Sequence, residues 1–201
     1  MPVSLDHAIV NTTQLGLETV GQVLEHIAHQ RRVAARLTVD GREPELGNME
    51  VLRAMRTDEH TIHIDTANPR EMALDALSAM EQALGQADAD KDQAAELLQQ
   101  NQTQAALAQL SACLVTWQQA QQCMAQSAQL VGIDLDQVQV DGEDLQAVVS
   151  RFAEQLREIR RALEDQDYVA LGDVLTYELG ETARQWRSAI VSLSTAVAQA
   201  S

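Results

Sequence analysis

The sequence is short of aromatic side chains, and this shortage limits the kind of core that it can build. One Phe, two Trp and two Tyr make up 2% of the residues. The strands of β-sandwiches draw on aromatic and β-branched residues. A core without aromatic residues has to rely on Leu, Val, Ile, Met and Ala. The composition therefore favours packing of helix on helix over a β-sandwich.

Long apolar runs and bridging cysteines are also missing. No window reaches about 18 apolar residues, so we expect no transmembrane helix. Residues 1–10 lack the basic segment and the long apolar run of a signal peptide, so we expect no signal peptide. Cys113 and Cys123 fall in one predicted helix, where a rise of roughly 15 Å separates them, too far for a disulfide. Two free thiols are typical of a reducing compartment, and we expect a cytoplasmic protein.

Positive charge is scarce. The chain has 30 acidic and 14 basic residues, which give a formal net charge of −16, and Lys91 is its only lysine. Most of the acidic excess lies after residue 70. Such a surface repels the phosphates of nucleic acids and anionic membranes. We therefore expect neither a nucleic acid nor a membrane as a partner.

The known motifs of catalysis and cofactor binding do not occur. There is no Gly-rich phosphate loop and no G-x-S-x-G. His26 and His29 could share one face of a helix, whereas His60 and His63 would point to opposite faces of a strand. We expect no catalytic residue, no cofactor and no metal, and interpret the histidines as ordinary surface residues.

Acidic residues at alternate positions resemble the start of a calcium loop. Asp88, Asp90 and Asp92 match its first three ligand positions, but Gln93 and Gln99 stand where a Gly and a bidentate Glu are needed. Carboxylates also suit the N-terminus of a helix. The predicted role of the three aspartates is therefore to cap a short helix.

Residues 1–68 mix the periodicities of helix and strand. The pattern predicts helices over 14–30 and 48–55 and strands over 33–39 and 61–66, with a turn at Asp40-Gly41. Because two strands alone are marginally stable, residues 8–10 and 133–140 are considered as weaker candidates for a third strand. These residues are predicted to form a small two-stranded α/β module.

From Pro69 onward the apolar spacing is helical throughout. The spacing predicts helices over 69–86, from Asp88 to a break at Asn101, and over 104–131, 144–164 and 167–198, the last kinked or split at Gly180. Short links favour antiparallel neighbours. The predicted fold class is therefore mostly α (α+β), with an antiparallel bundle of long helices over residues 69–201. In it, Glu178 is expected to pair with an arginine of the preceding helix, at position 157, 160 or 161.

A long stretch of the chain carries no charge. From Leu97 to Ile133 there is no Asp, Glu, Lys, Arg or His. On a helical wheel the apolar residues form one stripe, and the adjoining arc holds mainly glutamines, including Gln118, Gln122, Gln126 and Gln129. One interpretation is a central helix of the bundle with a partly solvated glutamine face. The other is that these glutamines contact a partner protein or a second copy.

One segment carries a resemblance. The stretch from Ala162 to Leu179, which includes Asp165-Gln166-Asp167-Tyr168 and Thr176-Tyr177-Glu178, resembles a segment of uncharacterised bacterial helical proteins. The acidic character and antiparallel helices are also similar in style to flagellar and type III export chaperones. The α/β module departs from the pattern of those chaperones. The resemblance implies a helical, chaperone-like protein and assigns no active residue.

These observations lead to an expectation about function. We expect a non-catalytic cytoplasmic interaction protein, an adaptor or chaperone-like protein that binds a protein partner or forms a homodimer. The alternative is a small-molecule-binding or enzymatic domain with its site between the α/β module and the bundle.

Overall fold

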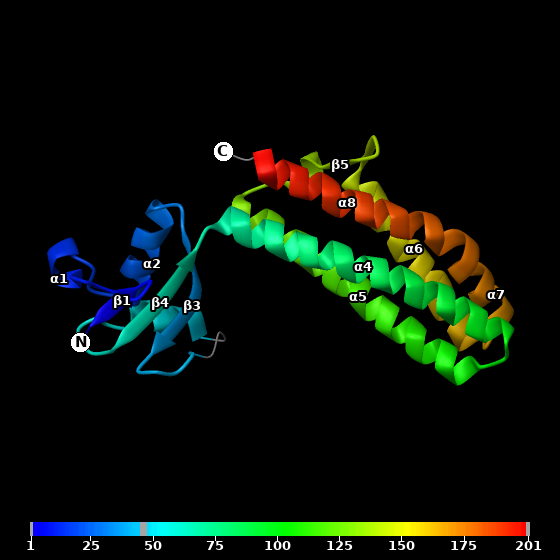
Figure 1. Ribbon diagram of the computed structural model, residues 1–201, viewed down its shortest axis with the longest axis horizontal. Coiled ribbons are helices and arrows are strands. Elements are labelled where there is room, and N and C mark those ends of the chain that lie inside the picture. The colour runs from blue at the N-terminus through cyan, green and yellow to red at the C-terminus, as the bar shows by residue number, and fades with distance from the viewer. Residues whose placement is uncertain (1, 45–47, 200–201) are drawn as a thin grey trace. The chain divides into compact units, whose positions relative to one another are not determined.

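The computed structural model describes residues 2–44 and 48–199. The chain divides into two compact units, Met1–Met72 and Ala73–Ser201, which are treated one at a time. The predicted fold class is confirmed, because helices dominate and a small mixed sheet comes first (Figure 1). The predicted division into domains 1–68 and 69–201 concerns independent folding, which this arrangement does not test, so it stays a prediction.

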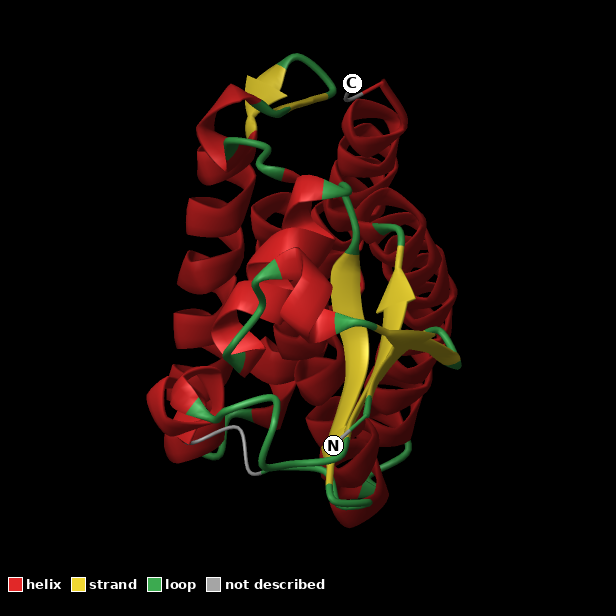
Figure 2. Cartoon of the chain, turned by 90° about the vertical axis from the view of Figure 1, so that its left-hand side faces the viewer, coloured by secondary structure: helices red, strands yellow, loops and turns green. Residues whose placement is uncertain are grey.

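The sheet of the first unit has four strands rather than the two predicted from the sequence (Figure 2). Its order is β2-β1-β4-β3, with β1 parallel to β4 and the outer pairs antiparallel. The strands are β1 (Val3–Leu5), β2 (Ala8–Val10), β3 (Val33–Val39) and β4 (Ile62–Ala67). The weaker candidate at residues 8–10 is therefore a strand, and it lies at one edge.

The turn between β1 and β2 explains why β1 was missed. Asp6 and His7 connect the two strands, and both have positive φ, 47° and 67°. Two such residues make the mirror-image turn that matches strand twist, and Asn-Gly or Asp-Gly is its usual signal. Asp-His gives no such signal. Asp40-Gly41, which does, forms the predicted turn with φ of 51° and 79°.

The predicted helix over residues 14–30 is interrupted. Helix α1 (Thr12–Leu15) ends at Gly16, whose φ is 68°, and α2 (Val20–His29) begins after the cap Thr19. The Thr19 side chain accepts from the backbone N–H of Gln22, and the Gln22 side chain accepts from the backbone N–H of Thr19. This reciprocal capping fixes the start of α2.

One face of α2 packs on the sheet to form the core of the first unit. Val20, Val23 and Ile27 of the helix are buried together with the strand residues Val3, Ile62 and Ile64 and with Leu52. Leu52 belongs to the short helix α3 (Met49–Ala54). Burying a side chain of this size contributes about 1.5–3 kcal/mol relative to leaving it in water. The core of the first unit contains no aromatic side chain.

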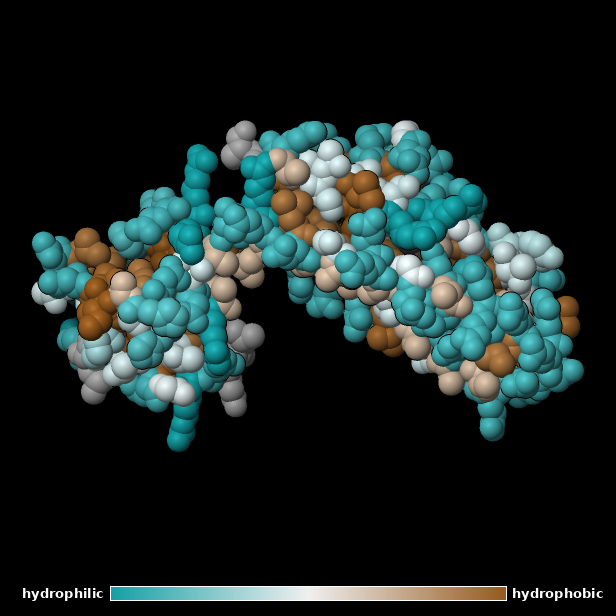
Figure 3. All heavy atoms as spheres, in the orientation of Figure 1, coloured by the Kyte–Doolittle hydropathy of each residue, from teal (hydrophilic) through white to brown (hydrophobic). Residues whose placement is uncertain are grey.

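The second unit is an antiparallel arrangement of long helices. They are α4 (Pro69–Gln99), which belongs to this unit from Ala73 on, α5 (Thr103–Val131), α6 (Leu145–Glu164), α7 (Tyr168–Asp173), a π-helical turn over Val174–Glu178 and α8 (Leu179–Gln199). Figure 1 shows the long helices running side by side, and Figure 3 shows a visible surface that is mostly hydrophilic with scattered apolar side chains. The predicted final helix is split just ahead of Gly180, by the π turn.

The predicted break near residue 87 is wrong. Helix α4 runs without interruption, so Asp88, Asp90 and Asp92 lie in mid-helix and cap nothing. Each has a partner within the unit. Asp88 pairs with Arg187 at 3.2 Å, Asp92 pairs with Lys91 at 2.5 Å, and Asp90 accepts from the side chain of Gln86 at 3.1 Å. A continuous helix also cannot form the turn of a calcium loop.

Residues with positive φ end the long helices. Asn101 has a φ of 59° and ends α4 as predicted, and Gln166 with 55° ends α6. At both sites the next residue donates its N–H to a carbonyl five positions back, from Gln102 to Leu97 and from Asp167 to Ala162. These bonds satisfy carbonyls that a helix end leaves free, and the short links keep successive helices antiparallel.

The candidate strand over residues 133–140 does not join the sheet of the first unit. Only β5 (Gln139–Val140) forms there, and it pairs with β6 (Glu143–Asp144) inside the second unit. Asp141-Gly142 makes the turn, with φ of 52° and 87°. The Asp-Gly dipeptide is a strong hairpin signal that the sequence interpretation overlooked.

An aromatic trio holds the centre of the bundle. Trp117 of α5 and Trp186 of α8 both meet the ring of Phe152 of α6 edge-on, with centroids 5.1 and 5.4 Å apart. Trp117 is 1% exposed and Trp186 is fully buried. Edge-to-face pairs add about 0.5–1.5 kcal/mol beyond area burial. Both tryptophans therefore belong to the core of the bundle.

Candidate interaction surfaces

Helix α5 carries a solvent-facing strip without charge, here called the neutral face. It consists of residues that lie on one arc of the helix and are all exposed: Gln104, Ser111, Val115, Gln118, Gln122, Gln126 and Gln129. The structure thus brings the four predicted glutamines together on one open surface. Whether they bind a partner stays a prediction.

The opposite side of α5 belongs to the core. Leu110, Cys113, Trp117 and Met124 are each at most 2% exposed. The apolar stripe of the uncharged stretch is therefore surrounded by protein, as expected for a central helix of the bundle. Within the part of the chain that the structure describes, no element covers the glutamines. An uncharged helix in a chain of net charge −16 therefore has one buried and one open side.

The buried thiol of α5 is unreactive as a nucleophile. Cys113 donates to the backbone oxygen of Ala87 at 3.2 Å. Burial raises the pKa of this thiol to about 12, and the nearby Asp88 carboxylate contributes in the same direction. Only the thiolate is a nucleophile, so Cys113 does not act as one at neutral pH.

The single lysine is buried against the π turn. Lys91 of α4 is 5% exposed, and its Nζ lies 2.5 Å from Oδ1 of Asp92 and 3.4 Å from the backbone oxygen of Leu175. A second buried side chain, Gln155 of α6, donates to the backbone oxygen of Glu178 at 3.2 Å. Wider π turns free backbone carbonyls from the α-helical pattern. Two neighbouring helices thus supply donors for the carbonyls at both ends of this turn.

Glu178 does not pair with an arginine as the sequence suggested. Arg160 pairs with Glu164 at 2.8 Å, and Glu178 instead hydrogen-bonds the side chain of Glu158. The π turn holds an extra residue, so the residues around it depart from the α-helical register on which the prediction rested. Hydrogen bonding to Glu158, with some burial and the repulsion between the carboxylates, raises the pKa of Glu178.

Replacing Glu158 by Gln should stabilise the protein at neutral pH. Because the pKa of Glu178 is raised in the folded state, the stabilisation that this carboxyl group contributes is fully present at low pH. That contribution is lost as the pH rises through the raised pKa. Glu158→Gln removes the repulsion, so we expect the Tm to rise by about 1–3 °C at pH 7. The gain should disappear near pH 4, where wild type keeps the shared proton. Thermal unfolding at both pH values measures this, and an equal gain at both would contradict the shared proton.

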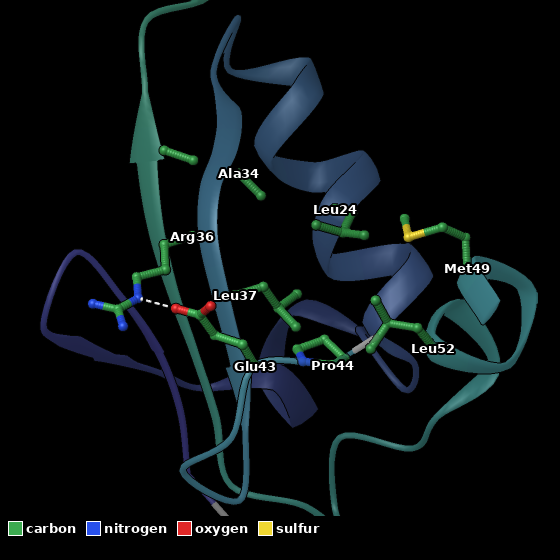
Figure 4. A pocket seen from close by; sticks show the side chains of 9 residues that line it. Leu24, Ala34, Arg36, Leu37, Glu43, Pro44, Met49 and Leu52 are labelled. Carbon is green, nitrogen blue, oxygen red and sulfur yellow. Dashed lines mark hydrogen bonds and ion pairs between the residues drawn. The ribbon is translucent and has the colours of Figure 1, made fainter. Parts of the chain in front are cut away.

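A groove of about 330 Å³ lies in the first unit and was not predicted from the sequence. Figure 4 shows Leu24 of α2 and Met49 and Leu52 of α3 facing β3, with Leu37 pointing from the strand toward them. Ala34, Ala35, Arg36, Glu43 and Pro44 complete its lining. Because its walls come from three elements with different periodicities, no single sequence pattern marks it.

The histidines are satisfied by local partners. Nδ1 of His29 lies 2.7 Å from the backbone oxygen of Glu25, His26 contacts the side chain of Gln30 at 3.0 Å, and Nδ1 of His60 contacts Asp40 at 2.8 Å. Within residues 2–44 and 48–199 there is no cluster of three His, Cys, Asp or Glu side chains that could hold a metal ion.

Parallel pairing of β1 and β4 brings Ser4 beside His63. The Ser4 hydroxyl makes a short hydrogen bond with Nδ1 of His63, on the open face of the sheet. A catalytic triad needs a third group that orients the imidazole. The nearby Asp65 lies 4.0 Å from His7 instead. The described residues therefore form a Ser–His pair and not a triad.

Comparison with known proteins bears on the bundle. A family model described as "Domain of unknown function (DUF8042)" matches residues 75–189. The match spans more than half of the chain. The protein belongs to the DUF8042 family. The DUF8042 region includes the neutral face of α5, the buried lysine and the π turn, and leaves out the first unit. No curated protein and no solved structure matches the chain.

None of the helices in the described part of the chain combines the length and the apolar character needed to cross a bilayer. The apolar residues of α5 lie on one side only, and its other side is the neutral face.

Proposed function

We propose that the chain is a non-catalytic protein-interaction protein, an adaptor or chaperone-like protein of the cytoplasm, which docks through the neutral face of α5. The observation that carries the proposal is the exposure of this uncharged strip in a chain of net charge −16. Centres of protein interfaces are depleted of charged residues. The two free thiols support a reducing compartment.

The partner proposed for this face is a second copy of the chain. Two copies of net charge −16 repel each other over most orientations. An approach through the neutral face keeps like charges apart at the centre of the contact. A two-fold axis would set the same strip of both copies face to face. Glutamine amides both donate and accept hydrogen bonds, so the strip can complement itself.

The size of the strip predicts a weak dimer. A helix of 29 residues is about 44 Å long and presents a strip roughly 10 Å wide. The contact would bury roughly 450 Å² on each copy, or ~900 Å² in total, which is at the low end of specific interfaces. We therefore expect reversible association in the micromolar range rather than a permanent dimer.

Sedimentation analysis across the micromolar range tests this proposal. Wild type should show a concentration-dependent monomer–dimer equilibrium. Gln122→Glu with Gln126→Glu sets four carboxylates into the two-fold contact, and like charges facing each other should weaken the dimer by at least about tenfold. The control Gln82→Glu with Gln99→Glu adds the same charge at exposed positions of α4 and should leave association unchanged. A wild-type monomer at every concentration would rule out self-association.

A further inference from the structure

The groove of the first unit has the dimensions and composition of a binding site. Its volume of about 330 Å³ falls in the range of roughly 300–1,000 Å³ found for ligand sites. Leu52 is 5% exposed, whereas Met49 is 42% exposed. An exposed methionine is unusually suited to contacts with varied partners, because its side chain is flexible and polarisable.

A close approach of two helices holds the groove in place. A Cβ atom on Gly21 of α2 would lie 3.0 Å from the backbone oxygen of Arg53 of α3, so glycine permits this approach. Glu25 of α2 and Arg53 also form an ion pair at 3.2 Å. These contacts fix α3 against α2 and leave the groove between the helices and β3.

The groove adjoins a sheet edge. Strand β3 ends the order β2-β1-β4-β3 and pairs with β4 on one side. On its outer side, Val39 exchanges backbone hydrogen bonds with Arg42, at 2.9 and 3.0 Å, and this closes the edge at that end. The stretch from Val33 to Leu37 has no strand beside it in the described part of the chain. Such an edge can pair with an added extended segment.

The same segment is basic in an otherwise acidic protein. Between residues 31 and 42 there are four arginines and one aspartate. Arg32 pairs with Asp6 at 3.5 Å and Arg36 with Glu43 at 2.7 Å. Arg31 and Arg42 are exposed, and neither forms an ion pair with another described residue. Charge complementarity therefore favours carboxylates as the neighbours of whatever fills the groove.

We propose that this groove binds an extended segment of another protein in which a bulky apolar side chain is flanked by carboxylates. The apolar side chain fills the space between Leu37, Met49 and Leu52, the backbone of the segment pairs with β3 at Val33–Leu37, and the carboxylates approach Arg31 and Arg42. This site lies in a different unit from the neutral face of α5. A test of the groove is therefore independent of a test of the proposed self-association.

Fluorescence anisotropy with the full chain tests the proposal. The probe is a fluorescein-labelled heptapeptide with a central Phe between two Val residues and Asp or Glu at the other positions. It should bind with micromolar affinity. A matched peptide with Lys in place of every acidic residue, and another with Ala in place of Phe, should each bind at least about tenfold more weakly.

Two variants of α3 locate the site. Met49→Glu puts a carboxylate at the rim of the groove and should weaken binding of the acidic peptide at least about tenfold. Val51→Glu is the matched control, because Val51 is 53% exposed on the same helix and does not line the groove. It should change affinity less than about twofold. Far-UV circular dichroism of both variants checks that the fold is kept.

Three outcomes would overturn the proposal. They are no binding of the acidic peptide, equal binding of the lysine peptide, and equal weakening by both variants. If dodecanoate raises the Tm in a Met49-dependent manner while the peptide does not bind, the groove takes a small amphipathic ligand and the peptide proposal is wrong. Sedimentation of the Met49→Glu variant should match wild type, which separates this result from the test of self-association.

Discussion

Trp186→Ala is expected to remove about 3–5 kcal/mol from the free energy of unfolding, as large-to-small changes of buried aromatic residues do. Trp186 is fully buried and contacts the ring of Phe152, which in turn contacts Trp117. The substitution leaves a cavity at the point where α5, α6 and α8 meet. Because protein interiors are closely packed, the surrounding helices can close such a cavity only in part.

Urea unfolding followed by far-UV circular dichroism measures this loss. The matched control is Val191→Ala on the same helix, since Val191 is 48% exposed. It should cost less than about 1 kcal/mol. A loss below about 1 kcal/mol for Trp186→Ala would show that the aromatic trio is not the centre of the bundle's stability.

Lys91→Glu is expected to cost about 3–5 kcal/mol, the range for leaving a buried charge without a partner. The substitution puts a carboxylate at a site that is 5% exposed, beside Asp92 and the backbone oxygen of Leu175. Both neighbours repel it, and the oxygen of Leu175 loses its donor. The loss should therefore exceed that caused by a neutral side chain of similar size.

Lys91→Met separates charge from packing. It keeps most of the volume of the side chain and introduces no charge. Because the Asp92 side chain is 70% exposed, it leaves no buried charge without a partner. We expect it to cost less than about 1.5 kcal/mol in the same urea experiment. Equal losses for Lys91→Met and Lys91→Glu would mean that the lysine acts through packing alone.

The helices of the bundle could be predicted because their apolar residues recur at helical spacing. Leu145, Val148, Phe152 and Ile159 of α6 form such a series, and all four are buried. The same rule located the exposed glutamines of α5. Local spacing carries this information because each position on a helix fixes the direction of its side chain.

The features that were missed depend on partners far away in the sequence or on unusual turn residues. A carboxylate at Asp88 favoured the start of a helix at that position. In the structure Asp88 lies inside α4, where Arg187 of α8 pairs with it. The Glu158 partner of Glu178 depends on the π turn, and no residue type specifies such a turn. The groove needs α2, α3 and β3 together. Such features follow from packing, which single-sequence patterns do not record.

The position of the aromatic residues gives the bundle an optical reporter of its own. Phe152, the tryptophans and the tyrosines all belong to the second unit. Intrinsic fluorescence and near-ultraviolet circular dichroism therefore follow the bundle alone, while the first unit is silent at those wavelengths. Its unfolding is visible only in the far-ultraviolet signal. One melting curve of the unlabelled protein is followed by the aromatic signals and the other by far-ultraviolet circular dichroism. The difference in Tm between these two curves then measures how strongly the folding of one unit depends on the other.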